Sequence, residues 1–268
     1  MLPVVRRFHQ QSLFLIDYSV MIHYHGTPCG GSRQDVARFL VGRHALIPFA
    51  RPDDLPIALE VCQSVCLDNS AFTYWKAGKG DVDFDGYHSW VQSLAGHPRL
   101  DWCLIPDKID GTEQQNVNLV TKWLRVGSKV IGVPVWHLHE SLEWLEYLVN
   151  NFQRVALGSS GQWATPGTDG WWRRIESVMS VACDTMGKPK ARLHGLRMLD
   201  PRIFQHIPLS SADSTNATMN AGIIKVFGQY PPATQYQRLA VIADRIESNS
   251  SAACWDGKQN DLFALMQT

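Results

Sequence analysis

The sequence predicts an α/β fold, a single-domain (β/α)8 barrel of the TIM type, and three observations support this. Short apolar runs of β-forming residues alternate with longer helical patterns along nearly the whole chain. Eight such runs can be placed, each followed by a helical segment. The chain has 268 residues, 45% of them hydrophobic, and barrels of this type commonly run to about 250 residues as one domain. An open doubly wound sheet is the alternative, and the strand count favours closure.

The expected strands share an apolar core and mostly end in a polar or glycine-containing cluster. They lie at residues 19–23, 44–48, 64–67, 101–105, 133–137, 153–157, 191–195 and 208–212. Several helices between them begin at residues that suit an N-cap, such as Ser32 and Thr112. They are expected at 32–41, 54–62, 85–95, 112–125, 140–150 and 169–186, with short helices after 200 and 215. A last amphipathic helix at 233–248 is expected to pack outside the barrel, within one domain of residues 1–268.

Composition narrows the class of protein. The formal net charge is zero, so any site for a polyanion must be local rather than a property of the whole surface. The six cysteines form no CxxC pair, and we expect reduced thiols packed mostly in the core. No apolar run approaches the roughly 20 residues that span a bilayer, and the amino terminus lacks a signal pattern. We therefore expect a cytoplasmic protein that contacts no membrane.

Two acidic residues stand at strand ends and are the candidate catalytic pair. Asp68 follows the third apolar run and Asp213 ends the eighth. In a closed barrel both strand ends face the same mouth, where two carboxylates can divide the roles of nucleophile and acid/base. The alternative for each is a structural N-cap of the following helix. The coincidence of polar clusters at so many strand ends favours the catalytic interpretation and predicts an enzyme.

Further strand-end residues are candidates for binding a flat heterocycle. Asp107 can accept hydrogen bonds from its polar edge, and the loop from Gly158 to Ser159 offers backbone donors. The other candidates for this role are Asn69, Ser70, Phe72, His137 and His194. The spacing of His137 and His139 also suits a metal, so a metal-dependent barrel hydrolase using His137, His139, His194 and Asp213 is the rival enzyme class. His194 has a structural alternative as a hydrogen-bonded core histidine.

Two aromatic and basic segments are candidates for contact with nucleic acid. The first runs from Gln162 to Arg174 and offers Trp163, Trp171, Trp172, Arg173 and Arg174. The second contains Trp75 and Lys76. Such segments can wedge into a duplex or place cations on phosphates. A loop packed down by its own tryptophans is the structural alternative.

These residues resemble a known family. The run Asp68-Asn69-Ser70-Ala71-Phe72 is similar to the Asp-Ser-Gly-Gly-Phe motif of the tRNA-guanine transglycosylase superfamily, and Asp107, the Gly158 loop, His194-Gly195 and Asp213 follow in that family's order. The resemblance covers most of residues 19–220 and is nearest to compact, phage-associated relatives that act on DNA. It implies that Asp213 attacks the sugar C1′, that Asp68 is the general acid/base, and that Asp107, Gly158 and Ser159 hold the base.

The chain departs from that family in two respects. The family's Cys-x-Cys-x-x-Cys…His zinc site is missing, so we expect neither a metal nor another cofactor. Ser70-Ala71 replaces the double glycine, which predicts a pocket shaped for a different base. The expected function is excision of a modified, flipped base from DNA, leaving an abasic site, in a setting of phage defence. Base exchange is the alternative outcome of the same chemistry.

Overall fold

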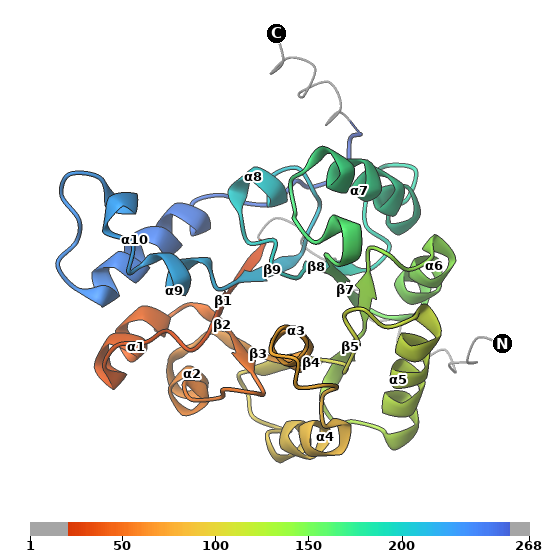
Figure 1. Cartoon of the computed structure of the whole chain (residues 1–268), viewed down its shortest axis with the longest axis horizontal. Helices are drawn as coiled ribbons and strands as arrows, with labels where there is room; N and C mark the ends of the chain where they lie inside the picture. Colours follow the sequence, from red (N-terminus) through yellow and green to blue (C-terminus); the bar gives the residue numbers. More distant parts are fainter. Residues whose placement is uncertain (1–20, 258–268) are drawn as a thin grey trace, which may run out of the picture.

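The computed structural model of the chain describes residues 21–257 (Figure 1). Its strands are all parallel and are joined by helices on the outside of a barrel. The strands are β1 (Ile22–Gly26), β2 (His44–Pro48), β3 (Ser64–Asp68), β4 (Leu100–Leu104), β5 (Ile131–Val133), β6 (Val135–His137), β7 (Arg154–Gly158), β8 (Arg192–Gly195) and β9 (Ser211–Ser214). They are hydrogen-bonded in the order β5-β4-β3-β2-β1-β9-β8-β7-β6. The predicted TIM-type barrel is confirmed.

The barrel closes through one interrupted strand. β5 pairs with β4, β6 pairs with β7, and only Pro134 separates them. Pro134 has no N–H to donate to a ladder, yet its carbonyl accepts from the amide of Ala156 at 2.9 Å. On the other side, the carbonyl of Val133 accepts from the amide of Ile105 at 2.8 Å. β5 and β6 therefore act as the two halves of one interrupted strand, so the nine strands occupy the eight strand positions of the barrel.

The helices cover the outer face of the barrel. They are α1 (Arg33–Leu40), α2 (Leu55–Val61), α3 (Ala71–Lys76), α4 (Phe84–Ser93), α5 (Glu113–Val126), α6 (Leu142–Asn151), α7 (Asp169–Ala182), α8 (Pro201–Phe204), α9 (Asn216–Asn220) and α10 (Gln235–Glu247), with 3-10 turns η1 (Gly161–Trp163) and η2 (Ile224–Phe227). Capping boxes at Ser32, Thr112 and Thr234 start α1, α5 and α10. In each, the cap side chain and the third helical residue satisfy otherwise unpaired N–H groups.

The element boundaries differ from the sequence prediction in a few places. β1 and β9 each begin three residues later than expected, and the part of the first prediction before residue 21 lies outside the described residues. α3 was not predicted. α7 ends at Ala182 instead of continuing to 186, because the Asp184 carboxylate accepts the amides of Met186 and Lys188 and turns the chain back. The strand expected at 133–137 is the interrupted strand made of β5 and β6.

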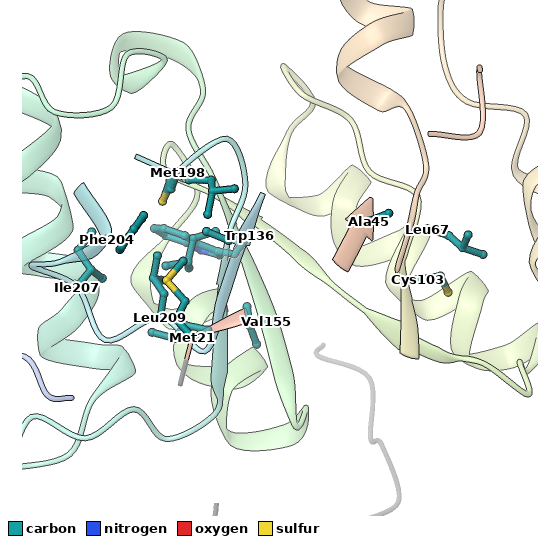
Figure 2. Close-up of a cluster of buried hydrophobic side chains, with 14 of the residues drawn as sticks. Met21, Ala45, Leu67, Cys103, Trp136, Val155, Met198, Phe204, Ile207 and Leu209 are labelled. Carbon is teal, nitrogen blue, oxygen red and sulfur yellow. The ribbon is translucent and has the colours of Figure 1, made fainter. Parts of the chain in front are cut away.

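Alternation along the strands separates two cores. Tyr24, Cys66, Trp102, Ala156 and their apolar neighbours point inward and fill the barrel. Their sequence neighbours point outward and form a larger core against the helices. Figure 2 shows part of this outer core, with Trp136, Met198 and Phe204 in one group and Ala45, Leu67 and Cys103 in another. Side chains that point inward from the carboxyl ends of the strands therefore face the mouth of the barrel.

α10 packs outside the barrel against α1 and α9, as Figure 1 shows at the left. Glu247 at its end bonds His25 of β1 at 2.7 Å and Arg43 at 3.0 Å. Five of the six cysteines are buried, and all six are free thiols. In residues 21–257 no helix has the length and apolarity needed to cross a bilayer.

Candidate active site

A pocket of about 390 Å3 opens at the carboxyl ends of the strands, a volume within the ~300–1,000 Å3 of small-molecule sites. Every strand position of the barrel except β2 contributes a polar residue or a glycine to the lining, from the strand or from the loop after it. Helix α3 forms one wall of the pocket, and Figure 1 shows it in front of the ring of strands. Of the residues predicted to bind or react, Asp68, Asn69, Phe72, Asp107, His137, Gly158, Ser159 and Asp213 line this pocket. Residues from five segments that are distant in sequence therefore meet at one mouth.

Asp68 is the last residue of β3 and is only partly exposed. Burial first, and then the negative charge of Asp213, raise the pKa of its carboxyl to about 7, although hydrogen bonds from Ser70 oppose the rise. Ser70 follows in a left-handed conformation with φ 65°, and its hydroxyl accepts the amide of Ala50 at 3.0 Å. Asp68 is therefore a carboxyl group that still holds its proton close to neutral pH.

Asp213 is 5% exposed on β9 and is surrounded by hydrogen-bond donors. Its Oδ1 lies 3.3 Å from Nε2 of His194 and accepts the backbone N–H of Arg197 at 3.2 Å. Burial lowers the pKa of His194 despite this contact with Asp213, so the ring is neutral near pH 7. Its Nδ1 lies 2.9 Å from Oγ of Ser211, and a hydroxyl donating there leaves the Nε2 proton for Asp213. Asp213 is thus held as an acceptor.

The position of His194 corrects one expectation. Its side chain is fully buried and lies behind Asp213, outside the pocket lining. It therefore cannot contact a base directly, and it acts on the pocket through Asp213. Ser70 is likewise buried behind the lining and contacts Asp68 and Ala50.

Asp107, Asn69 and His137 form a connected polar cluster on the opposite wall. Asn69 Nδ2 donates to Asp107 Oδ1 at 2.7 Å and to the carbonyl of Ile105 at 2.8 Å. Asp107 Oδ2 lies 2.7 Å from His137 Nε2. Burial alone lowers the pKa of His137, but the bond to Asp107 and the charge of Glu140 outweigh it and raise that pKa. The raised pKa of His137 favours the protonated ring beside Asp107.

A second carboxylate holds this cluster in place from behind. Glu140 is 3% exposed, and its Oε2 accepts the backbone N–H of His137 at 2.8 Å. Its Oε1 accepts from Asn116, whose Oδ1 in turn accepts the amide of Lys108, the residue after Asp107. Neither residue was predicted from the sequence, although Glu140 stands in the polar cluster that follows β6. Together they tie the β4 loop to the end of β6.

Gly158 and Ser159 form the floor between the two sides. A Cβ on Gly158 would lie 3.0 Å from His137 Nδ1, so a larger residue would displace the ring. That Nδ1 is buried without a hydrogen-bond partner among the described residues. Ser159 Oγ accepts from Nε1 of Trp171 at 2.9 Å, which fixes the loop to α7.

The metal alternative has no site among the residues that the structure describes. Residues 21–257 contain no group of three or more His, Cys, Asp or Glu side chains arranged to hold a metal ion. His137 is paired with Asp107, and His139, in the turn after β6, bonds Ser160 Oγ and the carbonyl of Gly111. His194 belongs to the opposite wall. The HxH spacing is explained by two separate structural networks.

Most of the aromatic and basic side chains predicted to contact nucleic acid between 162 and 174 are used inside the fold, which corrects part of the expectation. Trp171 and Trp172 are 0% and 5% exposed and belong to the outer core. Arg174 donates to the carbonyls of Leu138 and Glu140 and stacks on Trp136 and Trp163. These groups are used within the fold and do not face a nucleic acid. Arg173 is exposed, and in the other segment Lys76 is exposed and Trp75 is 46% exposed.

Comparison with known proteins shows a fold and no family. No protein-family model matches the sequence, and no curated protein matches it. A mutant tryptophan synthase alpha subunit from Pyrococcus furiosus aligns with a TM-score of 0.50 at 10% identity, covering 85% of this chain and 96% of that one. A second structure of that organism's subunit gives the same values. At this identity the likeness concerns the barrel alone.

The expected membership in the tRNA-guanine transglycosylase superfamily is wrong. Neither a family model nor a curated relative supports it, and the structural matches are tryptophan synthase alpha subunits. The physical reason is that Asp, Gly and His at successive strand ends are what any barrel mouth uses. In this chain the distinctive motif is a local turn in which Asn69 Oδ1 accepts the amide of Ala71 at 2.8 Å to start α3.

Proposed function

We propose that this chain is an N-glycosidase that cleaves the bond between a base and its sugar and releases the free base. The observation that carries the proposal is the unequal pair of carboxyl groups in one pocket. Asp68 has its pKa raised to about 7 by burial and by Asp213, whereas Asp213 accepts two hydrogen bonds. Carboxyl pairs whose environments separate their protonation states are typical of acid and nucleophile in glycoside cleavage.

The proposed reaction has two steps, departure of the base and attack by water, and both carboxyl groups take part in it. Asp68 donates its proton to the departing base nitrogen as the C1′–N bond breaks, and the bonding electrons leave with the base. Asp213 faces C1′ and stabilises the positive charge that develops there, or forms a covalent bond to it. Water then attacks C1′ and gives a proton to the Asp68 carboxylate, which restores both groups. The products are a free base and a sugar with a hydroxyl at C1′.

The wall formed by Asp107, Asn69 and His137 supports a heterocycle as the leaving group. Asp107 keeps unused acceptor capacity after its two hydrogen bonds, and so can accept N–H groups of a base edge. Phe72, Leu104 and Ile109 add apolar surface to the same pocket, which suits the faces of a flat ring. A sugar as leaving group would have little use for such surface.

We further propose that the substrate base belongs to DNA, with modified bases as the first class to test. A base in a duplex reaches a barrel mouth only when it is turned out of the stack. Trp75 lines a second hollow of about 370 Å3, which shares Ala71, Asp107 and Ile109 with the pocket. An exposed tryptophan beside the mouth suits stacking of a neighbouring base, and Lys76 next to it suits a phosphate.

Release of free base is the decisive measurement. The full-length protein is incubated with DNAs that carry different modified bases, and free bases and abasic sites are quantified by mass spectrometry and alkaline cleavage. We expect Asp213→Asn to slow release by about 10³-fold or more and Asp68→Asn by about 10²–10⁴-fold. Asp53→Asn, at an exposed carboxylate paired with Arg51, is the control and should leave the rate unchanged. Release that persists in Asp213→Asn, or no release from any substrate, would overturn the proposal.

The pH dependence gives an independent prediction. Asp68 must carry its proton to act as the acid, and its pKa is about 7. The rate of base release should therefore fall about tenfold per pH unit above pH 7. In Asp68→Asn the residual rate should lack this decline, since Asn does not titrate. A wild-type rate that stays level from pH 6 to pH 9 contradicts the assignment of Asp68 as the acid.

A further inference from the structure

Arg197 at the pocket rim has a backbone conformation that ordinary residues avoid. It lies two residues after β8, with φ 60°, and only Ser70 shares a positive φ among the other non-glycine residues from 21 to 257. Left-handed conformations cost energy and gather at functional sites. Here the conformation directs the N–H of Arg197 to Asp213 at 3.2 Å. Arg197 and Asp213 thus line the same pocket.

The guanidinium of Arg197 is held in plane but is not neutralised. It stacks on the ring of Phe72 at 4.4 Å, across the mouth from β8. One N–H donates to the carbonyl of Ala164 at 3.3 Å, and no carboxylate within the described residues forms an ion pair with it. A stacked guanidinium keeps its N–H edges free for acceptors in its own plane. This geometry suits two parallel hydrogen bonds from the guanidinium to the oxygens of an anion.

Arg197 is a cationic side chain in a pocket whose other charged residues are mostly acidic. Asp68, Asp107 and Asp213 supply the acidic groups, and Arg197 is the only arginine or lysine among the lining residues. The other basic side chain of the lining, His137, is already paired with Asp107. An unpaired arginine at the rim of an acidic pocket therefore has an open position for an anion supplied by the substrate.

We propose that Arg197 binds a phosphate attached to the sugar whose C1′ faces Asp213, so that the substrate is a nucleotide unit and not a nucleoside. The inference rests on the proposed function for the position of the sugar. Phosphate is the anion expected, because bidentate recognition of its oxygens is the use to which a preoriented guanidinium is best suited. The phosphate belongs either to a mononucleotide or to a strand.

Binding experiments test Arg197 separately from catalysis. Titration calorimetry on the full-length protein compares deoxyribose 5-phosphate with deoxyribose, neither of which contains a base. Hydrogen bonds to a charged group correspond to about 10- to 100-fold in affinity, so we expect a preference of that size for the phosphorylated sugar. Arg197→Asn should remove it. Asn adopts a left-handed backbone more readily than most residues, so the N–H to Asp213 is kept.

Two controls make the result interpretable. Arg202→Asn removes an exposed arginine that Asp200 already neutralises, and should keep the preference. Arg197→Gly suits the left-handed backbone even better and should also lose it, in a protein that melts no lower than the wild type. Equal binding of the two sugars by the wild type, or a preference that survives in both Arg197 variants, would overturn the proposal.

The source of the phosphate is resolved with two further probes. Deoxyadenosine 5′-monophosphate and a trideoxynucleotide with unphosphorylated ends are titrated into wild type and Arg197→Asn. A loss confined to the monophosphate supports a mononucleotide, and a loss with the trinucleotide supports a strand. If deoxyribose 5-phosphate binding depends on Arg197 while no base is ever released, the phosphate site stands and the proposed N-glycosidase function fails.

Discussion

Asp68 and Asp213 are the same residue type at the same end of the barrel, and their surroundings make them different. Asp68 has lost solvent and faces another carboxylate, so its pKa rises to about 7. Asp213 sits between the ring of His194 and the backbone N–H of Arg197. Both groups present an N–H to the same oxygen, Oδ1. The chemical division of labour therefore comes from the neighbours of each carboxyl group.

The unusual state of Asp68 predicts a pH-dependent cost to the folded protein. Because its folded pKa of about 7 exceeds the ordinary 3.8, the folded state binds the proton more tightly than the unfolded chain. Stability from this group is complete below pH 3.8 and is lost as the pH rises towards 7. Asp68→Asn should therefore be more stable than the wild type by a few kcal/mol at pH 8, with the difference vanishing near pH 4. Urea unfolding at both pH values measures this.

The control for this prediction is Asp53→Asn, whose carboxylate is exposed and paired with Arg51. Its effect should stay within about 0.5 kcal/mol at both pH values. If Asp68→Asn changes stability equally at pH 4 and pH 8, packing and not protonation is responsible. That result would contradict the raised pKa of Asp68, on which its role as the acid depends.

Individual site residues were predictable to the extent that they follow a strand. Asp68, His137 and Asp213 stand at strand ends and Asp107 follows β4 by three residues, and strand ends can be located from apolar runs. Arg197 was not predictable, because its role depends on a left-handed loop conformation that no local pattern indicates. The partnership of Glu140 with Asn116 depends on helix α5 meeting the turn after β6. Such contacts come from the tertiary fold.

At the level of elements, α7 supports the pocket through its first turn. Trp171 is fully buried there and donates its indole N–H to Ser159 Oγ at 2.9 Å. The sequence carried a signal for this: Trp171, Ile175, Val178 and Ala182 recur at helical spacing and form the buried face of the helix. Their periodicity indicates core residues, and it outweighs the basic and aromatic composition that suggested a surface for nucleic acid.

Replacing Trp171 by Phe tests the support that α7 gives to the Ser159 loop. The variant loses one buried hydrogen bond and part of the ring volume, so the free energy of unfolding should fall by about 1–3 kcal/mol. Trp75→Phe, at a site 46% exposed on α3, is the matched control and should change it by less than about 0.5 kcal/mol. Denaturant unfolding measures both. Equal effects of the two substitutions would contradict the assignment of Trp171 to the core.

Strand positions were predictable from apolar runs, but their pairing details were not. The run 133–137 was expected as one strand, and Pro134 divides it into β5 and β6 because it has no N–H for the ladder. β9 starts late because Pro208 has no N–H to donate and Leu209 donates its N–H to Ser251 Oγ and not to a neighbouring strand. Periodicity locates a strand, and tertiary hydrogen bonds set its ends.

For the whole molecule, the closed barrel was predictable and the family was not. Eight apolar runs alternating with helices constrain the architecture strongly. The order of strand-end acids and glycines constrains only the mouth, since every chain of this topology brings such residues there in sequence order. The resemblance at Asp68 to Phe72 was therefore short-range, and the structure accounts for it as the start of α3.

Helix α10 is tied to the first two strands of the barrel by Glu247, which predicts a second pH-dependent effect. Glu247 on α10 bonds His25 of β1 and Arg43 before β2. Burial raises the pKa of Glu247, but His25 and Arg43 outweigh burial and lower it below the ordinary 4.5. A lowered carboxyl pKa gives stability that is present above pH 4.5 and is lost as the pH falls through the folded value.

Glu247→Gln should accordingly lower the free energy of unfolding by about 1 kcal/mol at pH 7, with the difference shrinking towards zero near pH 3. Glu60→Gln, at an exposed position on α2, should have little effect at either pH. Because Asp68→Asn stabilises on the alkaline side and Glu247→Gln destabilises at neutral pH, the two difference curves have opposite signs and separate windows. A Glu247→Gln deficit that is equally large at pH 3 would mean that packing of α10, and not its charge, holds the helix on the barrel.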